Sequence, residues 1–311
     1  MFKNKQINYI MTDCKICKPF LKWVGGKTQI IEKLLKHFPK EIENYHEPFV
    51  GGGSVLLAIL SLRKENKIII KNKIYAYDLN PMLIRVYQNI QKHKKELYKY
   101  IEKYINEYDG LKGTTVNRNP TTLEEAKSSK ESYYYWLRKK YNDMDKTTVE
   151  CSALFMILNK TCFRGLYREG PNGFNVPYGH YKKTPTIISK KDLDEISNLI
   201  KDVEFLEMSF VKSILRATQG DFVYLDPPYV PVDVKSFVKY TADGFDLETH
   251  KKLFDEIVEL NKKKNRFVLS NAKVDMVVNY FNEFNIEELV ARRAIHSKNP
   301  NSTAVEVIIT N

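Results

Sequence analysis

The sequence predicts an α/β fold in which a doubly wound, mostly parallel sheet is interrupted by a mainly helical insert. Seven short apolar runs are typical of buried strands, and most of them alternate with segments that carry apolar residues at helical spacing. The stretch between the second and third runs is helical in pattern and long enough to form a separate insert, residues 83–189. The expected strands are 46–50, 74–77, 203–206, 222–225, 266–270, 287–291 and 305–310.

The N-terminal half alternates helices with strands. Residues 1–18 are mostly polar and unpatterned, so we expect a loose tail, whereas apolar residues from 30 to 38 have helical spacing. A glycine turn at 51–53 leads into a helix that starts at Val55. Asn80-Pro81 opens one long helix that Gly110 ends, and the Thr-, Asn- and Ser-rich residues 111–130 predict a loop.

Helices are also expected over residues 131–142, 148–160, 191–200 and 246–262, the last after Asp246, which is a favourable N-cap residue. The aromatic residues 133–136 are more typical of a helix core than of a binding surface. We therefore divide the chain into a tail (1–18), a sheet domain (19–82 and 190–311) and an insert domain (83–189).

The stretch Asp226-Pro227-Pro228-Tyr229 follows directly after the expected strand 222–225. Prolines lack the N–H that a strand ladder needs, so the chain leaves the sheet in a rigid turn at its carboxyl edge, where open α/β sheets bind ligands. The Asp226 carboxylate, the Pro227 carbonyl and the Tyr229 ring offer two acceptors beside an aromatic face, which suits the exocyclic amine of a planar base. The same residue types also form ordinary surface turns, so these four residues alone leave both interpretations open.

A glycine turn and an acid indicate a second ligand-binding feature. Gly51-Gly52-Gly53 joins a strand to a helix, and Asp78 ends the next strand, where it can accept both ribose hydroxyls of an adenosine-containing cofactor. The dinucleotide fingerprint is absent, and Gly25-Gly26-Lys27-Thr28 is not a phosphate loop because Leu21 stands where a glycine is needed. Trp23 and Lys27 offer a stacking face and a cation, although a packed Trp and a solvated Lys would fit equally well.

Residues 159–183 differ in composition from the rest of the insert. Pro171-Asn172-Gly173 is a hairpin-turn signal. Cations and aromatics alternate around it, which suits DNA groove contact and base stacking better than an ordinary solvated loop. The cations are Arg164, Arg168, Lys182 and Lys183, and the aromatics are Tyr167, Phe174, Tyr178 and Tyr181.

The overall composition suits a polyanionic partner. Fifty Lys and Arg against 38 Asp and Glu give a net charge of +12 and a pI of about 9.2, although an AT-rich genome would also favour Lys codons. No apolar run is long enough to span a bilayer and the N-terminus lacks a signal-peptide core, so we expect a soluble, intracellular protein. Cys14 and Cys17 form a single C-x-x-C, so we expect reduced thiols and no metal site.

Together these motifs resemble one family, the Dam/DpnII-type (class alpha) DNA N6-adenine methyltransferases. The resemblance runs from Pro19 nearly to Asn311, and the motifs in this order are highly specific. It rests on residues 20–27, 47–53, 78–80, 165–168, 174–179, 226–229, 269–271 and 306–311, and on Tyr240-Thr241 with Gly244-Phe245.

The resemblance implies a Rossmann-like methyltransferase fold that uses S-adenosyl-L-methionine, leaves S-adenosyl-L-homocysteine and delivers the methyl group to adenine N6 in double-stranded DNA, commonly within GATC. The target adenine would be flipped out of the duplex, and the insert would be the target-recognition domain. A cognate restriction endonuclease could act separately, and a monomer or weak dimer is expected. Implied catalytic residues are Asp226, Pro227 and Tyr229; implied cofactor contacts are Trp23, Lys27, Phe49, Gly51, Gly53, Asp78 and Asp226; implied DNA contacts are Arg164, Leu166, Arg168, Tyr181 and Lys182.

Two positions depart from the family pattern. Ser209 stands where the family commonly has an Asp before Phe, with Glu207 nearby, and Arg164 stands where an Asn usually precedes Gly-Leu. An Arg prefers guanine where an Asn prefers adenine, so the exact target sequence is open. Three other functions remain compatible with the sequence: methyl transfer to cytosine N4, a DNA-binding homologue without catalysis and, less well, an RNA-binding protein, because aromatic ribonucleoprotein motifs are absent.

Overall fold

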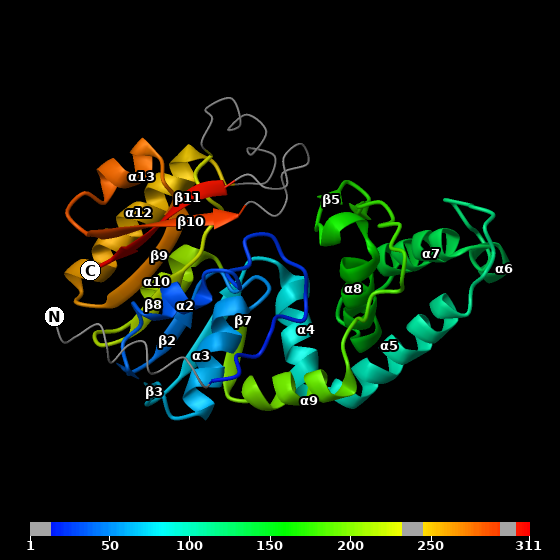
Figure 1. Ribbon diagram of the computed structural model, residues 1–311, viewed down its shortest axis with the longest axis horizontal. Helices are drawn as coiled ribbons and strands as arrows, with labels where there is room; N and C mark the ends of the chain where they lie inside the picture. The colour runs from blue at the N-terminus through cyan, green and yellow to red at the C-terminus, as the bar shows by residue number, and fades with distance from the viewer. Residues whose placement is uncertain (1–13, 232–244, 293–302) are drawn as a thin grey trace. The chain divides into compact units, whose positions relative to one another are not determined.

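The computed structural model describes residues 14–231, 245–292 and 303–311, and the chain forms two compact units (Figure 1). One unit comprises Met1–Ile16, Lys27–Leu79 and Asp202–Asn311, and the other comprises Cys17–Gly26 and Asn80–Lys201. The insert expected from the sequence, 83–189, falls inside the second unit, which also contains residues 190–201. The functional division into sheet and insert domains stays a prediction.

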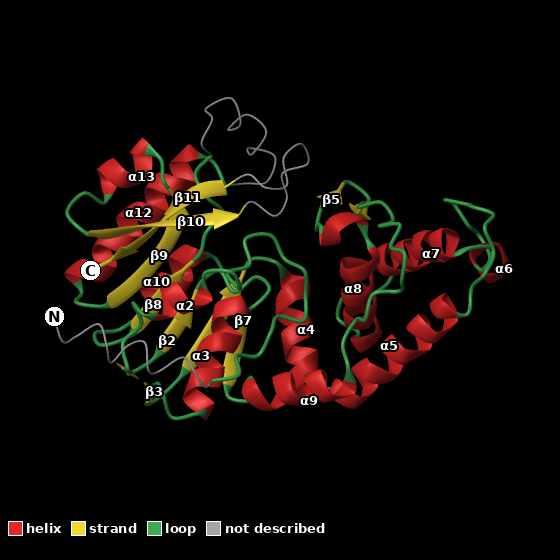
Figure 2. Ribbon diagram, in the orientation of Figure 1, coloured by secondary structure: helices red, strands yellow, loops and turns green. Residues whose placement is uncertain are grey.

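The first unit is built on a seven-stranded sheet of order β10-β11-β9-β8-β2-β4-β7, which confirms the predicted fold class. Strands β9, β8, β2, β4 and β7 are parallel to their neighbours in this series, and only β11 runs antiparallel, to both β9 and β10 (Figure 2). The bounds are β2 Tyr45–Glu47, β4 Ile74–Asp78, β7 Val203–Glu207, β8 Phe222–Leu225, β9 Arg266–Ala272, β10 Asn285–Arg292 and β11 Thr303–Thr310.

Two details of the sheet differ from expectation. Strand β2, expected over residues 46–50, ends at Glu47 and not at Val50, because Pro48 has no N–H to continue the ladder. A separate pair of two-residue parallel strands, β1 (Glu41–Ile42) and β3 (Ile69–Ile70), was not predicted, since two residues carry no measurable periodicity.

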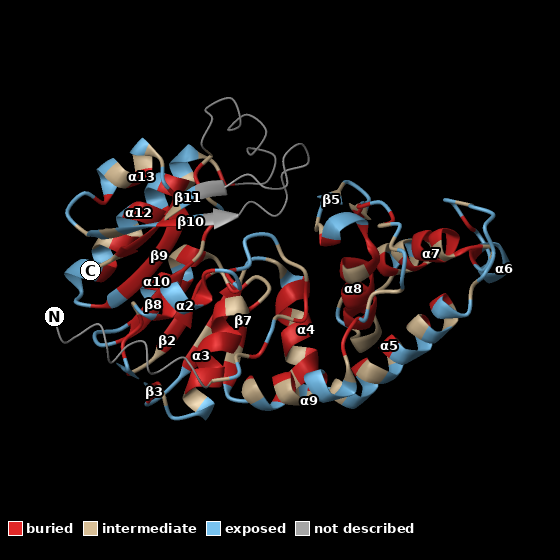
Figure 3. Ribbon diagram, viewed as in Figure 1, coloured by how far each residue is buried: buried red, intermediate tan, exposed pale blue. Residues whose placement is uncertain are grey.

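Helices cover both faces of the sheet. Phe38, after α2 (Ile31–Leu35), packs on Phe222 and Tyr224 with ring centroids 4.7 and 5.6 Å apart, whereas Val223 and Leu225 belong to the core formed with α10 (Phe210–Leu215), α12 (Leu247–Lys262) and α13 (Asp275–Tyr280). Strand β8 is therefore buried along its whole length, as a strand covered on both faces must be (Figure 3). Helix α3 (Ser54–Lys64) begins directly after the glycine turn.

The second unit is mainly helical and has α8 at its centre. This helix is almost entirely buried and contacts α4, α5 and α7. The bounds are α4 Pro81–Lys92, α5 Lys94–Asp109, α6 Leu123–Ala126, α7 Lys130–Asp143, α8 Val149–Thr161, η1 Phe163–Gly165, β5 Glu169–Gly170, β6 Gly173–Phe174 and α9 Lys190–Leu199. Tyr133 and Tyr134 are buried, which confirms the interpretation of the aromatic stripe as core.

Two predictions for this unit were wrong. The long helix after Asn80 is broken at His93, whose φ of −130° and ψ of 28° are not helical. Apolar positions continue from Ile90 to Leu97 across the break, so the periodicity does not reveal it. The expected loop 111–130 contains the short helix α6, which begins after Thr122 because the Thr122 side chain accepts from the Glu125 N–H.

In the described part of the chain, none of the helices has the length and apolar character needed to cross a bilayer. Within the same residues, no group of three or more His, Cys, Asp or Glu side chains could hold a metal ion, and the four cysteines are free thiols. Tyr240, Thr241, Gly244 and residues 1–13 of the tail lie outside the described residues.

Candidate active site

The sheet order places the carboxyl ends of β8, β2 and β4 next to one another in the first unit. These ends carry the Asp226 turn, Glu47 with the glycine turn that follows it, and Asp78. The juxtaposition expected from the sequence is therefore present in this unit. It arises because parallel strands all end at the same edge of a sheet.

Lys27 lies buried against the Asp226 carboxylate. Its ammonium is 2.7 Å from Asp226 Oδ2, and the two side chains are 3% and 17% exposed. The same ammonium is 4.9 Å from the centroid of the Tyr229 ring, and the Lys27 backbone N–H donates to Ser54 Oγ at 3.0 Å. The alternative of a solvated Lys27 is therefore wrong, whereas a ligand-binding role for the Asp226 turn stays a prediction.

Carboxyl groups outnumber the ammonium in this cluster of Lys27, Asp226, Glu47 and Glu306. Burial raises the pKa of Asp226, the Lys27 ammonium opposes this, and the Glu306 charge raises it further. Burial also raises the pKa of Glu47 to about 8, against the hydrogen bond from Tyr45 O–H at 2.6 Å and with the help of the Asp226 charge. Such a site favours a ligand that brings positive charge with it.

The Asp226 turn is tied to two further strands. The Tyr229 hydroxyl donates to Glu306 Oε2 of β11 at 2.9 Å, and the Val230 N–H donates to Asn271 Oδ1 of β9 at 3.1 Å. Both segments carry part of the family resemblance, but no role for Glu306 or Glu47 was predicted from the sequence. For Glu306 the signal was a carboxylate within an otherwise mostly apolar strand, whereas Glu47 follows His46 and had no such signal.

The glycine turn is joined to Asp78. Asp78 Oδ2 accepts the Gly51 N–H at 3.0 Å, and the Val50 N–H donates to the Tyr77 carbonyl at 2.9 Å. Gly51 and Gly53 have φ of 47° and 71°, the left-handed conformation that favours glycine, and Gly53 leads directly into α3. Backbone N–H groups at a helix start, beside an acid, are suited to hold a nucleoside.

The first-unit site has two further neighbours, the aromatic Phe49 and the polar Ser209. Phe49 stacks on Phe210 with centroids 5.9 Å apart and meets Phe245 edge-on at 6.1 Å. Ser209 is the N-cap residue of α10, and its hydroxyl accepts the Lys212 N–H at 3.5 Å. Serine therefore keeps the capping role that an Asp would have at this position, but it supplies no carboxylate.

The remaining predicted site residues lie in the second unit. Trp23 packs against Tyr167 and Phe155, with centroids 5.3 and 6.3 Å apart. Arg164 is exposed and has φ 57° and ψ 10°, and its guanidinium lies 5.1 Å from the Phe163 ring centre. Leu166, after the left-handed Gly165, is half-buried.

The predicted hairpin is confirmed, with β5 and β6 antiparallel around residues 171 and 172. Arg168 spans it, because its Nε donates to Asn175 Oδ1 at 2.6 Å. Tyr181 O–H donates to the Cys162 carbonyl at 3.0 Å and accepts from Lys22 Nζ at the same distance, while Lys182 is exposed.

Two aromatics of this region do not offer the expected stacking surface. Phe174 and Tyr178 are 3% and 7% exposed and form part of the second unit's core, so the stacking interpretation was wrong for them. The exposed aromatic of this region is instead Phe163, at 43%, for which no role was predicted from the sequence. Arg164 and Gly165, which follow Phe163, both have positive φ, a property of the backbone that the sequence does not show.

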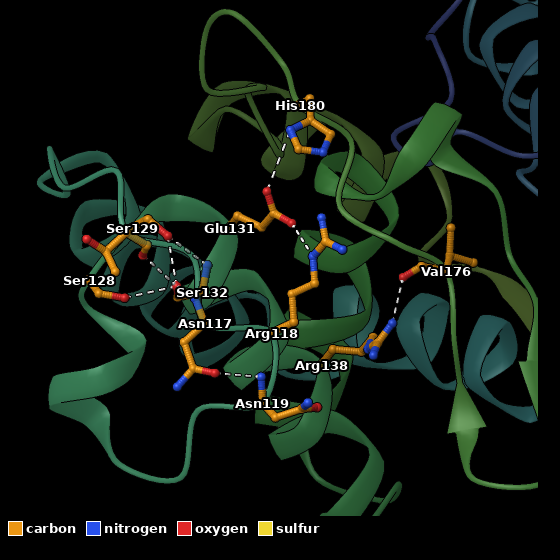
Figure 4. Close-up of polar contacts among 11 residues, drawn as sticks. Asn117, Arg118, Asn119, Ser128, Ser129, Glu131, Ser132, Arg138, Val176 and His180 are labelled. Atoms are coloured by element: carbon orange, nitrogen blue, oxygen red, sulfur yellow. Dashed lines mark hydrogen bonds and ion pairs between the residues drawn. The ribbon is translucent and has the colours of Figure 1, made fainter.

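A polar cluster on α7 fixes two loops of the second unit (Figure 4). Glu131 is buried, accepts from Arg118 Nε at 2.9 Å and lies 3.7 Å from His180 Nδ1. Arg138 donates to the Val176 carbonyl at 3.2 Å. Arg118 and His180 are both exposed, so the cluster presents a guanidinium and an imidazole on the surface of this unit.

Comparison with known proteins gives a consistent result. The family profile of D12 class N6 adenine-specific DNA methyltransferases matches residues 23–295. Type II methyltransferase M.MjaIII of Methanocaldococcus jannaschii is 36% identical over 293 residues, which cover 90% of this chain and 93% of that protein. Type II methyltransferase M1.LlaDCHI of Lactococcus lactis subsp. cremoris is 31% identical, covering 94% and 95%, and a DNA adenine methylase of Vibrio cholerae is 30% identical, covering 81% and 80%.

The resemblance based on sequence motifs is thereby confirmed at the level of the family. The profile spans most of the chain, and the relatives match over nearly their full length. The chain belongs to the D12 class of N6 adenine-specific DNA methyltransferases.

Proposed function

We propose that this protein is a site-specific methyltransferase that transfers a methyl group from S-adenosyl-L-methionine to adenine N6 in duplex DNA, within GATC. The observation that carries the proposal is the buried ion pair of Lys27 and Asp226 beneath the Tyr229 ring. It lies at the sheet edge that also carries the glycine turn and Asp78.

The first-unit site fits this cofactor in two respects. The excess of carboxyl groups around Lys27 suits a cationic ligand, and the Gly51–Asp78 pair suits a nucleoside. Lys27, Phe49, Gly51, Gly53, Asp78 and Asp226 would hold it, and Trp23 stays a predicted contact. When bound, the cofactor supplies an electrophilic methyl group on a sulfonium.

Asp226, Pro227 and Tyr229 act on the base. An adenine is unreactive inside the duplex, so it is flipped out and stacked on the Tyr229 ring. The Asp226 carboxylate and the Pro227 carbonyl accept hydrogen bonds from the two N6 hydrogens, which aligns the nitrogen lone pair for attack, and the one proton that N6 loses leaves along the hydrogen bond to Asp226. The Lys27 ammonium favours the ionised form of Asp226. Only this form has two unprotonated carboxylate oxygens that can accept a hydrogen bond from the amine.

The second unit recognises the DNA. Arg164, Leu166, Arg168, Tyr181 and Lys182 are the proposed contacts, and an exposed Arg164 suits the O6 and N7 of the GATC guanine. Because the Methanocaldococcus and Lactococcus relatives are named type II methyltransferases, a cognate endonuclease that acts separately forms part of the proposal. Mapping modified adenines in DNA from cells that express the protein should find GATC; another site would overturn the target but not the reaction.

The variant Asp226→Ala tests the reaction. It should lose transfer of labelled methyl groups to DNA while duplex binding is retained, because the carboxylate acts on N6 and not on the phosphates. Asp202→Ala is the matched control, since Asp202 is an exposed acid of the same unit. Full activity of Asp226→Ala would refute the assigned role, and cofactor binding by the wild type without any turnover would indicate a silent homologue.

A further inference from the structure

The hydroxyl of Tyr229 is held by a residue from a distant strand. Tyr229 O–H donates to Glu306 Oε2 at 2.9 Å, and both side chains are partly buried in the first unit. Burial holds the pKa of the Tyr229 phenol well above its ordinary value, and the Asp226 and Glu306 charges add to this. The phenol therefore keeps its proton and donates it to the hydrogen bond with Glu306 Oε2.

Glu306 is out of place as a purely structural residue. It lies on β11, between β9 and β10, opposite Ala272 and Leu289, and it interrupts an apolar run that continues with the buried residues 307–309. Glutamate is depleted in strands, and this one also opposes the ionisation of Asp226. A residue that breaks local preferences in this way is expected where function requires it.

The bond to Glu306 fixes the remaining freedom of the ring. Lys27 Nζ lies 4.9 Å from the ring centre, and the adjacent Val230 N–H is held by Asn271 at 3.1 Å. These contacts fix the backbone and one side of the ring, but neither reaches the hydroxyl end. Glu306 anchors that end to β11, so the orientation of the whole ring is set by Lys27, by Asn271 of β9 and by Glu306 of β11.

We propose that Glu306 is a positioning residue that orients the Tyr229 ring as the stacking platform for the flipped base. This inference rests on the proposed function and adds a residue to it. Glu306 would act only through the Tyr229 hydroxyl, because a base must meet the ring face to stack and to bring its amine into line. Its loss should therefore slow the methyl-transfer step more than it weakens binding of cofactor or duplex.

A double-mutant cycle of Glu306→Ala and Tyr229→Phe tests the proposal. Each single variant should lower kcat about tenfold, with the KM for cofactor changed less than about twofold, and the double variant should be no slower than either single. Glu306→Gln keeps an acceptor for the hydroxyl and should recover most of the lost rate. Tyr229→Phe leaves β11 untouched, so it remains informative if Glu306→Ala fails to fold.

Three outcomes would overturn the inference: unchanged kcat in Tyr229→Phe, losses that add in the double variant, or Glu306→Gln as slow as Glu306→Ala. Each of these is measured against a wild type that methylates adenine. A wild-type protein that fails to methylate adenine would instead refute the proposed function, so the two failures are distinguishable.

Discussion

Replacing Lys27 by Met should destabilise the protein through a single electrostatic effect. The two side chains have similar length, but the variant leaves the Asp226 carboxylate without the cation that lies 2.7 Å from it. Within the cluster of Lys27, Asp226, Glu47 and Glu306, Asp226 would then have only the Glu47 and Glu306 carboxyls as charged neighbours. Their charge raises the pKa of Asp226 beyond the rise that burial already causes.

The expected loss follows from burial. Removing one partner of a buried ion pair typically costs about 3–5 kcal/mol, and we expect about 3 kcal/mol at pH 8 because Asp226 keeps some solvent contact. The loss should shrink as the pH falls. The Asp226 carboxyl, whose pKa is raised in the folded protein, takes up a proton at low pH, and the uncompensated charge disappears.

Urea unfolding of the cofactor-free protein at pH 8 and pH 5 measures this effect. The double variant Lys27→Met/Asp226→Asn should recover part of the loss, because it removes the orphaned charge. Arg63→Met is the matched control, since Arg63 pairs with Asp202 at 3.4 Å on the surface and should cost less than about 1 kcal/mol. A loss in Lys27→Met as small as in this control, or a double variant no more stable than the single, would contradict the reasoning.

Three further predictions concern other groups. Burial raises the pKa of Glu47 from 4.5 to about 8, so the free energy of unfolding falls as the pH rises between these two values. This fall is at most about 5 kcal/mol, and Glu47→Gln should abolish it in urea unfolding measured across this pH range. Burial lowers the pKa of His250 from 6.5 to about 4, so the free energy of unfolding falls as the pH drops through this range. His250→Leu should remove about 3 kcal/mol of that fall in urea unfolding. Arg164→Asn should weaken discrimination at the guanine by about 1–3 kcal/mol in competition binding, whereas Lys182→Ala should weaken all duplexes equally.

The features predicted correctly depend on residues that are close together in the sequence. Strand β8 and the turn at Asp226 follow from four apolar residues and two prolines, and the hairpin follows from Pro171-Asn172-Gly173. The sheet edge that joins Asp226, Gly51 and Asp78 could be inferred because parallel strands end together.

The features that were missed depend on contacts between distant residues. Nothing near Lys27 in the sequence shows that its ammonium is buried against Asp226, and nothing near Tyr229 shows that Glu306 accepts its hydroxyl. The break at His93 was missed for another reason: the apolar spacing continues across it. Composition alone likewise could not separate the buried Phe174 from the exposed Phe163.

The most direct test of the proposed chemistry is to identify the modified base. Duplex DNA would be incubated with the purified protein and methyl-labelled S-adenosyl-L-methionine, digested to nucleosides and separated, with Asp226→Ala as the parallel sample. We predict that the label appears only in N6-methyldeoxyadenosine, and only with the wild-type protein. Label in N4-methyldeoxycytidine, or equal labelling by Asp226→Ala, would contradict the claim that Asp226 and Tyr229 present an adenine amine for methylation.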